Sequence, residues 1–170
     1  MRAALNALYE AAAWVAAIMM IGVLVMVMIG IFGRQMDFYV PGTDAYAGYL
    51  MAGSGFMALA HTFKRGEHIR VTLLLQSLGG AGQRSLELWS LVVATLLAGV
   101  LAFYSVRLAW QSHLFHDIST GNDATPLWIP QLGMACGTLI LLVALADDLV
   151  LEWSGRRVVP DAASEPVRSE

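Results

Sequence analysis

Charge and cysteine are both scarce in this sequence. Of its 170 residues, 14% are charged and 58% are hydrophobic, whereas a soluble domain usually carries about 25% charged residues. The single cysteine, Cys136, lies in an apolar run, which excludes a disulfide within the chain and a cysteine-based metal motif, and we interpret it as a small packing residue. Together with several uninterrupted apolar runs, this composition indicates an integral membrane protein.

The sequence also lacks the residue patterns of catalysis and of stand-alone transport. It has no nucleophile elbow, no phosphate-binding loop and no paired carboxylates in the middle of an apolar segment. A protein that carries a polar substrate by itself needs polar or broken segments at the membrane midplane. The ionisable residues of the apolar segments instead lie near segment ends, where long side chains reach the interface, and these are Glu10, Glu87, Arg107, Asp147 and Asp148. We therefore expect no enzyme and no cofactor, but a helical body that packs against another protein.

Four apolar segments come close to the roughly 20 residues that a transmembrane helix needs. Backbone polar groups in lipid must be satisfied within their own segment, so each segment is predicted to be helical. The predicted fold is an all-α integral membrane protein with four transmembrane helices, at about 11–32, 45–63, 86–110 and 127–150. The first segment is longer than the apolar part of a signal peptide, so we interpret it as a retained anchor.

Basic residues predict the orientation of these helices. The connection between the second and third segments carries Lys64, Arg65, Arg70 and Arg84, whereas the connection before the fourth has no lysine or arginine. The positive-inside rule then places both termini and the second connection in the cytoplasm. Residues 71–78 have one apolar side and predict a short amphipathic helix in the interface plane. The polar residues 155–170 predict a disordered cytoplasmic tail beyond a membrane domain at 1–154.

Two stripes of small residues predict close helix contacts, because membrane helices meet where small side chains let their backbones approach. One stripe is a GxxxG motif in the fourth segment, and the other has an i, i+3, i+7, i+10 spacing in the second. The residues are Gly133 and Gly137, and Ala45, Gly48, Ala52 and Gly55. The pattern leaves open whether the partner helix belongs to this chain or to another one.

The histidines raise the alternative of a haem or metal site. Two histidines that share a haem must lie at matching depth on facing helices, whereas His61 and His113 lie at opposite ends of their segments. His113, His116 and Asp117 are spaced i, i+3, i+4, which makes a metal-binding face if they are helical and solvated loop residues if they are not. A membrane anchor of a haem or quinone redox complex therefore remains the alternative function.

The densest cluster of charge is "KRGEHIRV", residues 64–71, and the topology explains most of it. The same stretch resembles a Gly-x-His-Ile-x-Val-like motif that follows the second helix in small permease subunits of tripartite ATP-independent periplasmic (TRAP) transporters. The matching residues are Gly66, His68, Ile69, Arg70 and Val71.

Further features agree with that family over roughly residues 5–153. Glu10 matches an acidic residue at the start of the first helix, and Arg34 matches an arginine at its outer end. Asp44 matches the first residue of an acidic pair that opens the second helix, whereas Ala45 replaces the second acid. The fourth segment is entered through "TPLWIPQLG", which fits the Pro/Trp-containing entry of the family.

The resemblance implies a complex in the bacterial inner membrane. A large membrane subunit would bind the substrate and the coupling sodium, and a periplasmic binding protein would deliver an organic acid. The small subunit would be a scaffold that also offers part of the docking surface for the binding protein. By the same resemblance, His68 would cap the second helix and Arg34 would pair with Asp44. Anionic lipid headgroups would contact Lys64, Arg65 and Arg70.

Overall fold

The structure is a computed structural model that describes residues 2–38, 40–64 and 80–154. Within these ranges the chain forms four helices, α1 (Arg2–Gln35), α2 (Thr43–Lys64), α4 (Gly80–Leu114) and α5 (Trp128–Trp153). The only pairing of extended backbone in the same ranges is an isolated antiparallel bridge between Ile118 and Pro126. The predicted all-α fold class is therefore confirmed for the described part of the chain.

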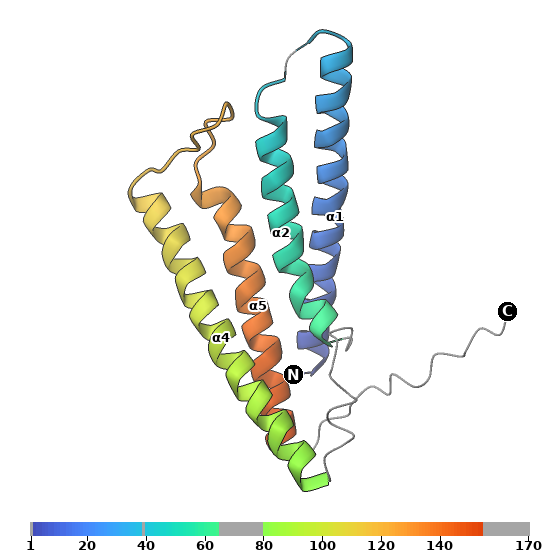
Figure 1. Ribbon diagram of the computed structural model, residues 1–170, viewed down its shortest axis with the longest axis vertical. Coiled ribbons are helices and arrows are strands. Elements are labelled where there is room, and N and C mark those ends of the chain that lie inside the picture. Colours follow the sequence, from blue (N-terminus) through green and yellow to red (C-terminus); the bar gives the residue numbers. More distant parts are fainter. Residues whose placement is uncertain (1, 39, 65–79, 155–170) are drawn as a thin grey trace, which may run out of the picture.

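The four helices lie in an open row, in the spatial order α1, α2, α5, α4 (Figure 1). Two antiparallel hairpins, α1–α2 and α4–α5, stand side by side, so that α2 and α5 are neighbours and run parallel to each other. Helix α1 touches α5 only slightly, and within the described ranges α1 and α4 make no contact. Among the described helices, the row therefore leaves broad lateral faces uncovered, unlike a closed four-helix bundle.

Three of the helices are long and apolar enough to cross a membrane, namely α1, α4 and α5. Helix α2 has 22 residues, but it falls below that level of hydropathy because glycine, tyrosine and serine replace large aliphatic side chains along it. The helices α1, α2 and α4 extend beyond both ends of the segments predicted from hydropathy, and α5 extends beyond the C-terminal end of its segment. Hydropathy marks the part of a helix suited to lipid, whereas the hydrogen-bonded backbone continues into the interface. The predicted amphipathic helix at 71–78 and the predicted tail at 155–170 lie outside the described residues.

Small residues form the contact between α2 and α5. A Cβ atom built on Gly133 would lie 3.3 Å from Cα of Gly53, and one built on Gly137 would lie 2.5 Å from the backbone carbon and oxygen of Phe56. Both glycines of the predicted GxxxG stripe thus lie against α2. Such close backbone approach maximises van der Waals contact where no hydrophobic driving force exists between helices.

Beyond the half-buried Ala45, the small-residue stripe predicted on α2 does not face another helix of the described part of the chain. Gly48, Ala52 and Gly55 are exposed, and no atom lies within 4 Å of a Cβ built on either glycine. The contact is made instead by the adjacent Gly53, against which Met19 of α1 also packs. The spacing identified a real stripe but could not tell which side of α2 turns inward, and a contact with another chain remains a prediction.

Candidate functional site

The chemically distinctive side chains gather at the two ends of the helices, which are called the two ends of the row. One end, here called the terminal end, holds the start of α1, the end of α2 and the end of α5. The other, here called the loop end, holds the connections 36–42 and 115–127. The two ends are built differently, since the first rests on an ion triad and the second on a hydrogen-bonded network between the two connections.

The terminal end holds one ammonium group between two carboxylates. Lys64 Nζ donates to Asp147 Oδ2 and to Asp148 Oδ1, each at 2.6 Å. These side chains are 21%, 27% and 13% exposed, respectively. The parallel packing of α2 on α5 brings the last residue of α2 level with the last turns of α5. We call these three residues the ion triad.

A buried tyrosine of α1 completes this cluster. Lys64 Nζ lies 5.5 Å from the centre of the Tyr9 ring, a cation–π distance. The Tyr9 ring is buried with Ala60 and Ala144, whose small side chains let α1, α2 and α5 converge. The Tyr9 hydroxyl is buried and has no hydrogen-bond partner in the described part of the chain. The ion triad joins α2 to α5, and Tyr9 attaches α1 to the same point.

The ion triad changes the interpretation of Lys64. The sequence predicted a contact with lipid headgroups, but the structure gives its ammonium two partners within the chain. Sequence reasoning missed them because the partners lie 83 and 84 residues away. The motif at residues 66–71, including Gly66, His68, Ile69, Arg70 and Val71, lies outside the described residues together with Arg65, and the roles predicted for those residues remain predictions.

At the loop end, hydroxyl groups of α2 bind the connection between α4 and α5. The Tyr49 hydroxyl lies within hydrogen-bond distance of Asp123 Oδ2, at 3.1 Å, and of Ser119 Oγ, at 3.0 Å, and the two contacts share its single proton. Ser119 Oγ donates in turn to Asp123 Oδ1 at 2.8 Å, and Thr125 Oγ1 donates to the Tyr46 hydroxyl at 3.1 Å. We call these hydrogen-bonded residues the loop network. It was not predicted, although Tyr46 and Tyr49, spaced i, i+3 near the start of the second apolar segment, could have indicated a polar contact there.

The Asp123 carboxylate is held in its ionised form. Desolvation raises its pKa, but hydrogen bonds from Ser119, Thr125, its own backbone and Tyr49 outweigh this and lower the pKa from 3.8 to about 2. A depressed pKa contributes stability that is complete above the ordinary value near 4. That stability is lost as the pH falls through about 2. The loop network should therefore be insensitive to pH in the neutral range.

Gly42 brings the two connections together. Its φ is +81°, a conformation that side chains rarely adopt. A Cβ atom on Gly42 would also lie 2.7 Å from Cβ of Asp123. Because both the backbone conformation and the close approach require glycine, Gly42 fixes how α2 begins relative to the loop between α4 and α5.

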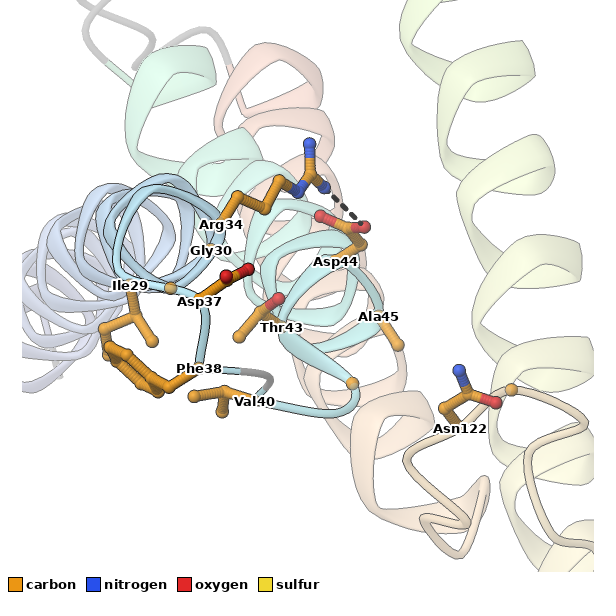
Figure 2. A pocket seen from close by; sticks show the side chains of 13 residues that line it. Ile29, Gly30, Arg34, Asp37, Phe38, Val40, Thr43, Asp44, Ala45 and Asn122 are labelled. Carbon is orange, nitrogen blue, oxygen red and sulfur yellow. Dashed lines mark hydrogen bonds and ion pairs between the residues drawn. The ribbon is translucent and has the colours of Figure 1, made fainter.

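Beside this junction, a hollow of about 530 Å³ opens among the end of α1, the start of α2 and residues 121–122 (Figure 2). Arg34 Nη2 lies 3.5 Å from Asp44 Oδ2, so the predicted pairing across the first connection is present. Both side chains are more than three-quarters exposed, and such a pair contributes little to stability. Asp37 lines the same hollow. The hollow thus presents one guanidinium and two carboxylates to the surroundings.

The remaining predicted residues are separated. Glu10 lines a shallow pocket at the terminal end with Trp14 and His61. Helix α4 ends at Leu114, before His116, whose φ is +56°. The helical i, i+3, i+4 face required for a metal at His113, His116 and Asp117 is therefore not formed, and the described residues contain no group of three metal-ligating side chains. The His113 ring instead packs edge-on against Trp128 at 5.2 Å.

Replacing Tyr49 with phenylalanine is expected to loosen the connection between α4 and α5. The substitution removes a hydroxyl that has one proton to donate to Asp123 and Ser119, so the loss is that of about one hydrogen bond. With a net value of about 0.5–1.5 kcal/mol for a hydrogen bond, amide hydrogen exchange in residues 116–126 should become roughly 3–10 times faster. Hydrogen-exchange mass spectrometry measures this change. The control is Tyr104→Phe, at an exposed tyrosine of α4, and equal exchange in both variants would contradict a role for the Tyr49 hydroxyl.

Comparison with known proteins identifies a family. The family model for the DctQ component of tripartite ATP-independent periplasmic transporters matches residues 23–155. No curated protein matches the chain in sequence. The matched range includes the last third of α1 and the whole of α2, α4 and α5, and therefore both the ion triad and the loop network.

Proposed function

Since the chain belongs to the family of the DctQ component of TRAP transporters, we propose that it is the small, non-catalytic subunit that scaffolds the large transport subunit. The family makes the chain one component of a transporter that works with a large membrane subunit and a binding protein. Together with three helices able to span a membrane, it makes the chain a multi-pass inner-membrane protein. The scaffold role is the finer statement that the following arguments support.

In this proposal, α2 is a fourth membrane span and the terminal end is cytoplasmic. With 22 residues, α2 is about 33 Å long at 1.5 Å per residue, which suits a hydrocarbon core of about 30 Å. It lies between α1 and α5, which are both able to span. A helix with neighbours on both sides tolerates lower hydropathy than one that is surrounded by lipid. The basic second connection supports the orientation.

The construction of the row supports a static role. Backbone contacts at Gly53 and Gly137 join the two hairpins in the middle of α2 and α5. The ion triad and the loop network join them again at the two ends. Three attachments distributed along parallel helices resist both sliding and splaying, which suits a subunit that stays in place while its partner moves.

The observation that carries the proposal is the exposed small-residue stripe of α2, formed by Gly48, Ala52 and Gly55. These residues face outward with nothing within 4 Å of a Cβ on either glycine. Small residues on a membrane helix are where another helix packs most closely. We assign this stripe to a helix of the large subunit, because every helix of the described chain that reaches α2 packs on its other sides.

Replacing Gly48 and Gly55 with leucine tests this assignment. Two leucine side chains would keep a partner backbone at a distance, so recovery of the large subunit with the tagged chain should fall by at least tenfold. The chain itself should remain monodisperse in mild detergent, because open space surrounds both positions. The matched control is Leu96→Ala on α4, which shortens an exposed side chain. Undiminished co-purification of the large subunit with the double variant would contradict the assignment.

The loop end is the proposed docking surface for the binding protein. The hollow with Arg34, Asp37 and Asp44, together with the loop network, presents polar groups there beyond the apolar helices. In this proposal the binding protein delivers an organic acid to the large subunit, which also holds the coupling sodium. The alternative of a haem anchor gains no support, since His61 and His113 lie on α2 and α4 at opposite ends of the row.

A further inference from the structure

A second recess lies between α4 and α5, away from all of the features above. It is a groove of about 530 Å³ with an almost wholly apolar lining. Gly99, Ala102 and Phe103 line it from α4, and Leu139 and Leu142 line it from α5. A Cβ on Gly99 would have only Leu142 near it, at 3.8 Å. The missing side chain at Gly99 therefore contributes to the open space.

The groove has a single charged residue, Arg107, close to its loop end. Arg107 is exposed, and it makes no ion pair with any carboxylate in the described part of the chain. It lies seven residues before the last residue of α4, which is about 10 Å along the helix. An arginine at that depth extends its guanidinium toward the interface. Trp110, which is also exposed, lines the groove beside it, as expected of an aromatic residue at the interface.

The length of the groove matches one leaflet of a bilayer. From Gly99 to Trp110 the helix advances about 16 Å at 1.5 Å per residue. The hydrocarbon core is about 30 Å thick, so one leaflet takes about 15 Å. The apolar part of the groove thus runs from near the midplane to the interface, and the cationic group lies at the interface.

We propose that this groove binds one anionic phospholipid from the leaflet at the loop end. An acyl chain lies along Phe103, Leu139 and Leu142, and the phosphodiester accepts hydrogen bonds from the Arg107 guanidinium. An apolar channel of leaflet depth with a single cation at its interfacial end is complementary to a phospholipid, which has apolar acyl chains and a phosphate at one end. A planar guanidinium also binds phosphate with two parallel hydrogen bonds.

The charge balance selects an anionic headgroup. The described residues supply no carboxylate to Arg107, so a headgroup of net negative charge neutralises it. A zwitterionic headgroup carries its own ammonium, which competes with Arg107 for the phosphate. Helix α4 stands at the edge of the row, and among the described helices it packs mainly on α5, so a lipid held across both helices stabilises that hairpin through its binding energy.

Native mass spectrometry of the full chain tests the proposal. The delipidated protein is titrated in detergent with phosphatidylglycerol, and separately with phosphatidylethanolamine, and the bound lipids are counted. We expect one phosphatidylglycerol to bind at least tenfold more tightly than phosphatidylethanolamine. Arg107→Gln should weaken its binding about tenfold or more, since a charge-assisted hydrogen bond is lost. Arg34→Gln, at the same end of the row but paired with Asp44, should bind as the wild type does.

A second variant tests the apolar part of the site. Gly99→Leu places a side chain in the groove and should weaken phosphatidylglycerol binding while leaving Arg107 in place. Glycerol phosphate, which has the charge but no acyl chain, should not compete. Equal lipid binding by the wild type and by Arg107→Gln would overturn the proposal, and so would equal losses in Arg107→Gln and Arg34→Gln. If Arg107→Gln kept the bound lipid but no longer recovered the large subunit, the proposal would be overturned, and Arg107 would instead pair with a carboxylate of that subunit.

Discussion

Replacing Gly137 with leucine should separate α5 from α2 and destabilise the whole row. A Cβ at this position would lie 2.5 Å from the backbone carbon and oxygen of Phe56. Neither atom belongs to a flexible side chain, so the two helices themselves must move apart. Overpacking usually costs about 1–3 kcal/mol, and a clash with backbone belongs at the upper end of that range. For a chain of this size, about 3 kcal/mol lowers the melting temperature by roughly 6–12 °C.

Thermal unfolding of the detergent-solubilised chain, followed by circular dichroism or by size-exclusion chromatography after heating, measures the effect. The matched control is Gly55→Leu, which adds the same side chain to a glycine with nothing within 4 Å. Its melting temperature should stay within about 2 °C of the wild type, which corresponds to less than 1 kcal/mol. If the melting temperature fell equally in both variants, the loss would come from placing leucine at any glycine of these helices. The close contact between α2 and α5 would then lose its support.

Replacing Lys64 with glutamine should produce the second large effect, at the terminal end. The substitution removes the ammonium that Asp147 and Asp148 share and leaves two adjacent carboxylates without it. Breaking a fully buried ion pair costs about 3–5 kcal/mol. The triad residues are 13–27% exposed, so we expect a smaller cost, about 2–3 kcal/mol. The loss should be measurable as a fall in melting temperature and as faster hydrogen exchange in the last turns of α2 and α5.

Two comparisons identify the source of this effect. Asp147→Asn keeps the Lys64–Asp148 contact and removes one of two neighbouring negative charges, so it should cost about 1 kcal/mol or less. Arg34→Gln breaks a pair that is mostly exposed and should cost about 0.5 kcal/mol or less. If Lys64→Gln lowered the free energy of unfolding no more than Arg34→Gln, the triad would contribute no more than an exposed ion pair. Its role in joining α2, α5 and, through Tyr9, α1 would then be refuted.

Much of the fold follows from local features of the sequence. The helical class was predicted correctly, and three of the four predicted spans correspond to helices that are long and apolar enough to cross a membrane, because the energetics of lipid act on each segment separately. The GxxxG motif at Gly133 and Gly137 also predicted a close contact that the structure contains. The family was evident from the residues around His68, and the match over residues 23–155 confirms it.

The contacts between helices required the tertiary structure. In lipid an apolar side chain is equally suited to face the membrane or another helix, so periodicity alone does not reveal the inward side of α2. For that reason the stripe that contains Gly55 left its partner open, and the structure shows that Gly53 makes the contact with α5. The loop network was missed for a related reason, since Tyr49 and Asp123 are 74 residues apart and neither forms part of a recognisable motif.

By itself, the sequence determined that this protein belongs in a membrane, where its helices lie along the chain, and to which transporter family it belongs. Only the tertiary structure decided that the helices form an open row, that Lys64 binds Asp147 and Asp148, and that an apolar groove lies beside Arg107. The physical reason is that insertion depends on the summed hydropathy of each segment. Helix order and pairing depend instead on the shape and charge of residues that meet only after the chain has folded.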